Sequence, residues 1–426
     1  MCYNRGMNAT DPHPSLHDFL QHHLTFYLDL LHQMVALNSF TLNARGVNAV
    51  GKLTAELFAP LGFAADFVPS PDFRYGRHLV LSRDGQPGGP TIGLISHLDT
   101  VFPSAEEQSN DFTFRIVGDR IYGPGSVDIK GGTVMIYMVL DGLRHFYPAV
   151  FEGVTWHILL NAAEEILAPD FGALARERLD GALAALVFEG GDVENGQYQL
   201  VTARKGMARY HITVEGRGSH AGAAHDKGAN AIVQLADVIR QIAGFTDYSR
   251  GLTFNVGTVL GGTVMNRVPH QAAASVEMRA FDTVAFEDGV AQMLALNEFC
   301  SVRSADDGYP CRVDVQLEGR WQPWPPNEAT FDLLAVWNAA AAELGLGAVA
   351  RQARGGLSDG NWLWDLLPTI DGLGPEGGNA HSSERSADGS KDQEYALASS
   401  FVPKALLNID AIVRLVAAGG VGAAGA

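Results

Sequence analysis

Two polar residues with the chemistry of a metal site follow one of the most apolar runs of this sequence. The run TIGLIS is followed by His97, Leu98 and Asp99. Because alternate residues of an extended segment point the same way, we expect Asp99 to lie beside His97 and to accept its second ring N–H. A metal-bound imidazole normally has such a carboxylate partner. The pair therefore indicates a metal-binding histidine and the acid that orients it.

More acids and one more histidine stand where other segments end. These are Asp128 after a glycine-rich segment, Glu164 and Glu165 after WHILLN, Glu189 after ALVF, and His381 in the loop sequence GGNAHS. Each motif alone is common on protein surfaces, but together they supply imidazoles and carboxylates, the ligands that suit zinc with an open coordination position. Two cations about 3.5–4 Å apart share a bridging carboxylate, and the sequence leaves open which acid bridges.

Adjacent carboxylates can divide the work of such a site between them. Side chains of neighbouring residues on an extended segment diverge, so one of Glu164 and Glu165 can bind a metal while the other accepts the proton of an attacking water. The sequence therefore predicts metal-assisted hydrolysis.

The elements that must position these residues alternate between strands and helices. Strands are predicted at 91–96, 155–160 and 184–188, with helices at 132–146 and 170–178 between them. The strands are almost wholly apolar, as strands covered on both faces are. This pattern predicts an α/β/α catalytic domain, and open α/β sheets place their sites at the carboxyl ends of the strands.

A second domain is predicted within the first. From Ala208 to Glu215 apolar and polar residues alternate, which is typical of a half-exposed antiparallel strand. The segment 206–319 has the order β-α-β-β-α-β of a ferredoxin-like α+β domain, so we expect residues 1–205 and 320–426 to form one discontinuous catalytic domain.

Composition excludes several classes of function. The chain has 426 residues, a formal net charge of -18 and no basic run, so nucleic acid and anionic membranes are not expected partners. No run reaches the roughly 18 apolar residues of a membrane span, and residues 1–15 lack a signal-peptide pattern. The cysteines, Cys2, Cys300 and Cys311, form no CxxC pair, and we expect Cys300 and Cys311 to be free thiols. A cytoplasmic location is predicted.

The motifs together resemble the zinc metallopeptidase family that contains glutamate carboxypeptidase, peptidase T, acetylornithine deacetylase, succinyl-diaminopimelate desuccinylase and aminoacylase. The resemblance covers essentially the whole chain and is closest to glutamate carboxypeptidase. It rests on the segments HLDTV (97–101), GPGSVDIKGG (123–132), NAAEE (161–165), FEGG (188–191), GSHAG (218–222) and NAHSS (379–383).

The resemblance implies a role for each candidate site residue of the catalytic domain. His97, Asp128 and Glu189 would hold one Zn²⁺, and Asp128, Glu165 and His381 the second; Co²⁺ or Mn²⁺ is an open alternative. Glu164 would be the general base, Asp99 would orient His97, and the peptide bond after Asp128 is expected to be cis. Relatives carry an acid three residues after the serine that follows the last histidine, whereas Glu384 comes after two.

The resemblance also implies roles for residues elsewhere. His220 would reach the active site of the partner subunit in a homodimer formed by the inserted domain, and would stabilise the oxyanion there. Asn266 and Arg279 would bind the substrate, since a guanidinium can grip a carboxylate through two parallel bonds. The turn that contains Gly356 could cradle a substrate carboxylate with backbone N–H groups.

The sequence thus predicts a hydrolase that cleaves an amide bond next to a free carboxylate. A glutamate-carboxypeptidase-like activity on small peptides is favoured, and an N-acyl-amino-acid deacylase is the alternative. A non-catalytic protein that binds a metal or an amino acid is the hypothesis from another class, although such a protein has no need of Glu164.

Overall fold

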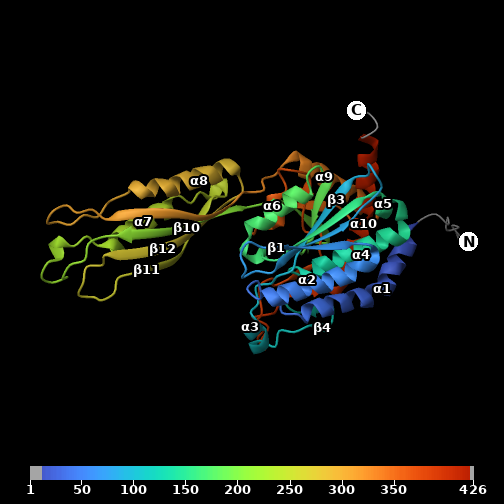
Figure 1. The fold of residues 1–426 in the computed structure, drawn as a ribbon, viewed down its shortest axis with the longest axis horizontal. Coiled ribbons are helices and arrows are strands. Elements are labelled where there is room, and N and C mark those ends of the chain that lie inside the picture. The colour runs from blue at the N-terminus through green and yellow to red at the C-terminus, as the bar shows by residue number, and fades with distance from the viewer. Residues whose placement is uncertain (1–11, 423–426) are drawn as a thin grey trace, which may run out of the picture. The chain divides into compact units, whose positions relative to one another are not determined.

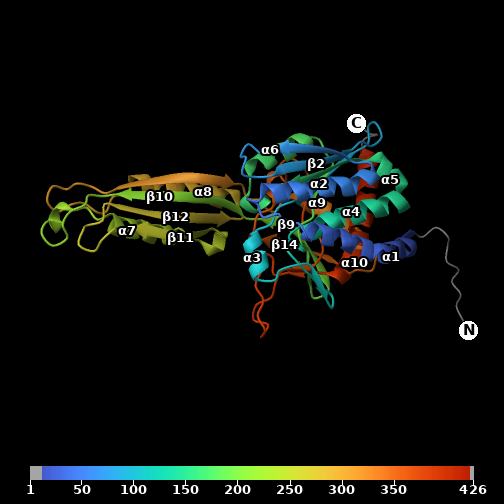
Figure 2. The ribbon, with the colours of Figure 1, turned by 60° about the horizontal axis from the view of Figure 1, so that its bottom comes forward.

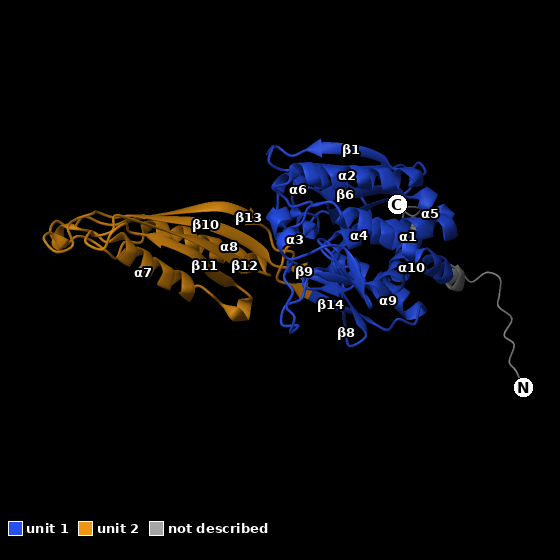
Figure 3. Ribbon diagram, turned by 90° about the horizontal axis from the view of Figure 1, so that it is seen from below, with its two compact units in different colours: residues 1–202, 326–352, 358–426 blue, residues 203–325, 353–357 orange. Residues whose placement is uncertain are grey.

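The computed structural model describes residues 12–422. Its contacts divide the chain into two compact units, drawn in blue and orange in Figure 3. Unit 1 contains Met1–Thr202, Pro326–Gln352 and Ser358–Ala426, and unit 2 contains Ala203–Pro325 and Ala353–Leu357. The expected insertion, residues 206–319, lies inside the range of unit 2. No helix of the described residues has the length and apolar character needed to cross a bilayer.

Unit 1 is built on a six-stranded sheet. The strand order is β1 (Ala64–Pro69), β2 (Arg77–Arg83), β6 (Thr155–Asn161), β3 (Thr91–His97), β7 (Ala184–Val187) and β15 (Thr369–Ile370). Strands β6, β3, β7 and β15 are parallel, and β1 and β2 form an antiparallel edge. The strands predicted at 91–96, 155–160 and 184–188 are confirmed as the centre of this sheet.

Helices cover both faces of the sheet, which explains why its strands are apolar on both sides. One face packs against α1 (Pro12–Val35), α2 (Ala44–Phe58), α4 (Lys130–Phe146), α9 (Glu328–Glu343) and α10 (Ala398–Gly422) (Figures 1 and 2). The other face packs against α6 (Pro169–Arg178) and a 3₁₀ turn, Asp359–Trp362. Leu94 belongs to the first core and Ile95 to the second, as the period of a strand requires. The predicted α/β/α class is confirmed.

Several shorter elements were not predicted from the sequence. A four-stranded sheet has the order β16 (Gly377–Gly378), β17 (Tyr395–Leu397), β5 (Arg120–Tyr122) and β4 (Arg115–Val117). A three-stranded sheet has the order β14 (Val349–Arg354), β9 (Gln197–Arg204) and β8 (Asp192–Glu194). Two short helices, α3 (Ser104–Ser109) and α5 (Pro148–Gly153), complete unit 1. The pairing of β17 with β5 matters for the site, because it brings a late segment beside the one that leads to Asp128.

Unit 2 has the predicted β-α-β-β-α-β order. Its elements are β10 (Gly206–Glu215), α7 (Ala231–Gly244), β11 (Thr253–Gly261), β12 (Gln271–Ala280), α8 (Thr283–Ala295) and β13 (Arg312–Trp321). The strands form an antiparallel sheet in the order β11-β12-β10-β13, and both helices contribute to one core with it. Alternate residues of β12 are buried, so one face of the sheet carries the core. The ferredoxin-like arrangement is confirmed.

Candidate metal centre

The parallel strands of unit 1 bring the predicted site residues to one edge of the sheet. His97 is the last residue of β3 and pairs with Asn161, the last residue of β6. Glu164 and Glu165 follow β6 closely, and Glu189 follows β7. Because the carboxyl ends of parallel strands lie at the same edge, side chains far apart in the sequence meet there. We refer to His97, Asp128, Glu164, Glu165, Glu189 and His381 as the acid–histidine cluster.

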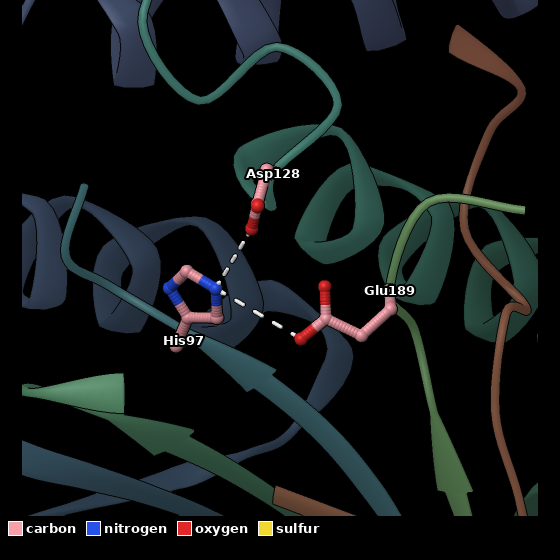
Figure 4. Close-up of side chains that lie close together, drawn as sticks. All are labelled: His97, Asp128 and Glu189. Carbon is pink, nitrogen blue, oxygen red and sulfur yellow. Dashed lines mark hydrogen bonds and ion pairs between the residues drawn. The ribbon is translucent and has the colours of Figure 1, made fainter. Parts of the chain in front are cut away.

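One half of the acid–histidine cluster is centred on His97. Its Nε2 lies 3.1 Å from Oδ1 of Asp128 and 3.9 Å from Oε1 of Glu189 (Figure 4). The ligand atoms of these three residues all lie within 4.8 Å of one another. His97 is only 2% exposed.

The other half is centred on His381. Its Nε2 lies 3.1 Å from Oε2 of Glu165 and 3.3 Å from Oδ2 of Asp128. The two oxygens of Asp128 therefore face two different imidazoles, which is the arrangement that a carboxylate bridging two cations requires. The peptide bond between Asp128 and Ile129 is cis, as the resemblance implied.

Asp99 does more than the sequence suggested. Nδ1 of His97 lies 3.3 Å from Oδ1 of Asp99 and 3.0 Å from its backbone oxygen. The Asp99 carboxylate also accepts the backbone N–H groups of Glu164 at 3.1 Å and Glu165 at 3.3 Å, and the hydroxyl of Thr41 at 2.7 Å. One buried carboxylate thus orients both the imidazole of His97 and the segment that carries the adjacent acids.

Other side chains hold the same segment. The N–H of Ala163 donates to Oδ1 of Asn161 at 2.9 Å, and the N–H of Ala162 donates to Nδ1 of His78 at 3.1 Å. Nε2 of His78 in turn lies 2.9 Å from Asp170. Four consecutive backbone N–H groups, those of residues 162–165, therefore donate to side-chain acceptors. Sequence reasoning gave no role to His78 or to Asn161, the first residue of NAAEE, because neither position by itself indicates which backbone groups its side chain accepts.

Glu164 has the properties of a proton-transfer group. It is 7% exposed, and its Oε2 lies 3.9 Å from Nε2 of His97. Burial raises the pKa of Glu164 well above its ordinary value; His97 offsets part of the rise, and Glu189 and Asp359 add to it. A carboxyl group tuned upward in this way can take a proton and return it.

The donor set fits a pair of divalent cations. Burial, followed by the charge of Asp128, raises the pKa of Glu165 to about 7. The carboxylates of Asp128 and Glu165, which accept hydrogen bonds from His381, raise the pKa of His381 to about 11. Several carboxylates thus share a largely buried space with the imidazole of His97, beside the exposed imidazole of His381, and the carboxylates repel one another. Cations remove that repulsion, and carboxylate with imidazole is a ligand set that zinc accepts.

Asp359 is a further acid beside the cluster. Its Oδ1 accepts a hydrogen bond from Nδ2 of Asn161 at 2.9 Å, and it is 3% exposed. Burial raises its pKa to about 7. The sequence singled out the turn that contains Asp359 only for Gly356, because a glycine turn signals backbone contacts, whereas the partner of a buried acid is visible only in three dimensions.

These pKa shifts predict how the metal-free protein responds to pH. Glu165 and Asp359 have folded-state pKa values of about 7, above their ordinary values, so each stabilises the fold below its ordinary pKa and loses that contribution as pH rises toward 7. We expect the free energy of unfolding of the metal-free protein to fall by a few kcal/mol, in order of magnitude, between about pH 4.5 and pH 7. Calorimetry across this range with a chelator present measures it.

Zinc and a variant provide the controls for this pH effect. Zinc binds deprotonated carboxylates, and of these two acids Glu165 is a proposed ligand, so zinc-loaded protein is expected to show a smaller decline. The variant Glu165→Gln/Asp359→Asn is expected to show a shallower slope without metal, because it lacks the two buried carboxyl groups whose pKa values are raised. A metal-free protein whose stability is constant or rises over this range contradicts the prediction.

Gly191, in the FEGG segment, has a specific steric role. A Cβ on this residue would lie 1.7 Å from Nζ of Lys404, which donates to the carbonyl of Gly372 at 2.8 Å. Lys404 is 1% exposed. The absence of a side chain at Gly191 therefore lets a buried lysine of α10 pack against the loop that carries Glu189.

Four predicted site residues, His220, Asn266, Arg279 and Gly356, belong to unit 2. Nδ1 of His220 accepts the N–H groups of Gly222 at 3.1 Å and Ala223 at 3.0 Å, which leaves Nε2 as the nitrogen that carries the proton. The carbonyl of Asn266 accepts the N–H of Ala221 at 3.0 Å. His220 and Asn266 are exposed and lie on neighbouring loops.

Arg279 and Gly356 also lie close together in unit 2. Arg279 donates to Oε1 of Glu277 at 2.6 Å and to the carbonyl of Gly355 at 2.8 Å. The carbonyl of Gly356 accepts a hydrogen bond from Arg204 at 3.0 Å. Two of the expected substrate-binding elements, the guanidinium and the glycine turn, are therefore in contact.

Comparisons with known proteins agree with this architecture. The family described as peptidase dimerisation domain matches residues 202–305. Carboxypeptidase G2 of Pseudomonas sp. (strain RS-16) is 28% identical over 377 residues, which cover 88% of this chain and 85% of that protein. Succinyl-diaminopimelate desuccinylase of Delftia acidovorans is 25% identical over 369 residues, which cover 83% of this chain and 91% of that protein.

A solved structure shows the same fold. The YXEP protein of Bacillus subtilis, described as a dinuclear metal-binding peptidase of the M20 family, aligns with a TM-score of 0.64 at 15% identity, covering 93% of this chain and 99% of that one. The relatives are named as peptidases or deacylases, which favours an enzyme over the non-catalytic binding protein that the sequence left open. Over most of its length the chain is therefore similar to metal-dependent peptidases and deacylases of the M20 family, and residues 202–305 match the peptidase dimerisation domain.

Proposed function

We propose that this chain hydrolyses an amide bond whose nitrogen belongs to an amino acid with a free carboxylate, and that it uses two Zn²⁺ ions. His97, Asp128 and Glu189 would hold one ion, and Asp128, Glu165 and His381 the other. The observation that carries the proposal is the position of Asp128, whose two carboxylate oxygens face His97 at 3.1 Å and His381 at 3.3 Å. Co²⁺ and Mn²⁺ suit the same ligands.

The residues around the cations have separate tasks. When bound, a pair of zinc ions lowers the pKa of water and polarises the carbonyl oxygen. Glu164 accepts the proton of the attacking water and later gives it to the leaving nitrogen. Asp99 fixes the position of the His97 imidazole relative to the Glu164 backbone, because it contacts both.

The expected substrate is a small peptide or an N-acyl amino acid. The likeness to carboxypeptidase G2 supports a glutamate-carboxypeptidase-like activity, and the likeness to a desuccinylase supports N-acyl-amino-acid deacylation as the second candidate. In either reaction the free carboxylate needs a cationic or N–H-rich partner. We propose Arg279, with Asn266 and the turn at Gly356, for that role.

The test compares matched substrates with and without a blocked carboxylate. Dipeptides and N-acyl amino acids are offered in pairs, one with a free carboxylate and one as the amide, before and after treatment with a chelator. We expect hydrolysis of the free acids only, loss of activity with the chelator, and recovery when zinc is added back. Equal rates for the blocked substrates contradict the proposed specificity, and activity in the chelator contradicts the metal mechanism.

We also propose that the protein is a homodimer through unit 2. Strand β11 is an edge strand of its sheet. Apolar residues on and beside it are exposed, with relative accessible surface areas of 53% for Val259, 73% for Leu260 and 101% for Met265. An unpaired edge with exposed apolar residues favours pairing with another strand, and a second copy of β11 is the occupant that a two-fold axis supplies. The match to a peptidase dimerisation domain supports this occupant.

A complementation experiment tests the dimer and the role of His220 together. We expect His220→Ala and Glu164→Gln each to be nearly inactive. If His220 of the partner subunit completes the active site, co-expression of the two variants creates mixed dimers with one intact site, and activity reappears. Absence of recovery in mixed dimers that are shown to form contradicts the role of His220 across the dimer.

A cytoplasmic location remains our proposal. The free thiols of Cys300 and Cys311 support it, because reduced cysteines are usual in that compartment.

A further inference from the structure

We propose that Glu394 is a positioning residue that holds the bridging Asp128 in place. Oε1 of Glu394 accepts the backbone N–H of Val127 at 3.0 Å and that of Asp128 at 3.2 Å. The side chain is 0% exposed, so water does not offer these N–H groups another partner. The inference rests on the proposed two-metal site and adds a residue to it.

The fold explains why Glu394 reaches Asp128 across a large separation in sequence. Glu394 immediately precedes β17, and β17 pairs antiparallel with β5, with Tyr395 opposite Tyr122. Strand β5 leads directly into the segment that ends at Asp128. Pairing of the two strands therefore delivers the Glu394 carboxyl group to the backbone on which Asp128 stands.

The backbone of Glu394 also reaches the other side of the site. Its N–H donates to the carbonyl of Ser382 at 2.8 Å, and Ser382 directly follows His381. Glu394 thus links the segment of the bridging acid to the segment of the second imidazole. A residue with these contacts sets the relative position of two proposed ligands, Asp128 and His381, without touching a cation itself.

Glu384 has the wrong position for this role. By sequence Glu384 is the first acid after His381 and stands two residues after Ser382. In the structure Glu384 is 58% exposed at its side chain and pairs with Lys391.

The segment between the two acids closes on itself. The N–H of Ser386 donates to the carbonyl of Lys391, and Nε2 of Gln393 donates to the carbonyl of Ser383 at 2.7 Å. After this loop the chain therefore returns to the proposed metal site, and Glu394 is the acid of this segment that lies beside Asp128.

Length and acceptor geometry decide which substitutions Glu394 tolerates. Glu394→Gln keeps the side-chain length and a carbonyl oxygen for the two N–H groups but removes the ionisable carboxyl group. Glu394→Asp keeps an ionisable carboxyl group but withdraws the acceptor by one methylene group. A positioning role therefore predicts that Gln is tolerated better than Asp, whereas a role through charge predicts the reverse order.

The test measures zinc binding, independently of turnover. Metal-free Glu394→Gln and Glu394→Asp proteins are dialysed against buffered zinc, and bound metal is counted by elemental analysis. We expect Glu394→Asp to lose about 10–100-fold in zinc affinity, the usual effect of removing a residue that orients a ligand, and Glu394→Gln to lose less. kcat should fall in the same order, with KM less affected.

Two further variants separate the failure of this inference from failure of the proposed site. Glu384→Gln, in the same loop, should bind zinc as the unaltered protein does, and Asp128→Asn should lose zinc. If Asp128→Asn loses zinc but Glu394→Asp does not, or if Asp is tolerated better than Gln, the role of Glu394 is wrong while the site stands. If Asp128→Asn keeps both ions, the proposed site is wrong, and the role of Glu394 is overturned with it.

Discussion

Glu164→Gln is expected to keep both zinc ions and to lower kcat by a factor on the order of 10²–10⁴, the usual contribution of a general base. Glutamine matches the size of Glu164 and preserves its packing at 7% exposure, but an amide cannot accept a proton from water. The carboxyl group is the proton acceptor best placed for this step, because burial has raised its pKa while His97 lies 3.9 Å away. Steady-state kinetics with metal analysis of the same sample measures both quantities.

The adjacent acid provides the matched control. Glu165→Gln alters the same segment by the same chemistry, but Glu165 lies 3.1 Å from His381 and is a proposed ligand. It should lose zinc as well as activity, and added zinc should restore part of the rate. A Glu164→Gln protein with an undiminished rate refutes the assignment of the base, and one that lacks zinc shows that Glu164 is a ligand instead.

The local composition of the sequence made most of the catalytic sheet predictable. The run that became β3 is apolar at almost every position, and only a strand covered on both faces accommodates such a run. The pairing of β17 with β5 was not predictable in this way. Each strand has three residues, and their register depends on partners nearly three hundred positions apart, for which no local pattern exists.

The site residues also differ in how far local sequence predicts them. Its ligands were predicted because polar residues at the ends of apolar strands are unusual and the ends of parallel strands converge. Whether Asp128 or another acid lies between the imidazoles depends on angstrom-scale geometry, which strand patterns do not carry.

The residues that hold the backbone of the site are a different case. These side chains act by accepting hydrogen bonds from backbone N–H groups, as His78, Asn161 and Glu394 do. Any side-chain acceptor of suitable length and position could play this role. Such residues have no fixed spacing from the ligands. Glu384 illustrates the consequence, because counting along the sequence points to it while the fold presents Glu394.

Asp128→Asn is expected to have the broadest effect on the metal content of the protein. An asparagine side chain has one oxygen and one N–H₂ group, so it can face one cation with an acceptor but turns a donor toward the other. The loss of zinc affinity should therefore exceed the ~10–100-fold that follows removal of an orienting residue. We expect fewer than two zinc ions per subunit and nearly complete loss of hydrolysis, measured by elemental analysis and steady-state rates.

Glu189→Gln is the control that distinguishes the loss of one ion from the loss of both. Among the described residues, Glu189 belongs to the candidate metal group around His97, whereas Asp128 belongs to both groups. If Asp128 bridges, Glu189→Gln should weaken one ion while Asp128→Asn weakens both, so the two zinc-binding curves should differ in the number of sites that shift. Identical curves, with one weakened site in each, contradict the bridge. Because both substitutions exchange a carboxylate for an amide of the same size, such a difference reflects the position of the acid between the two imidazoles.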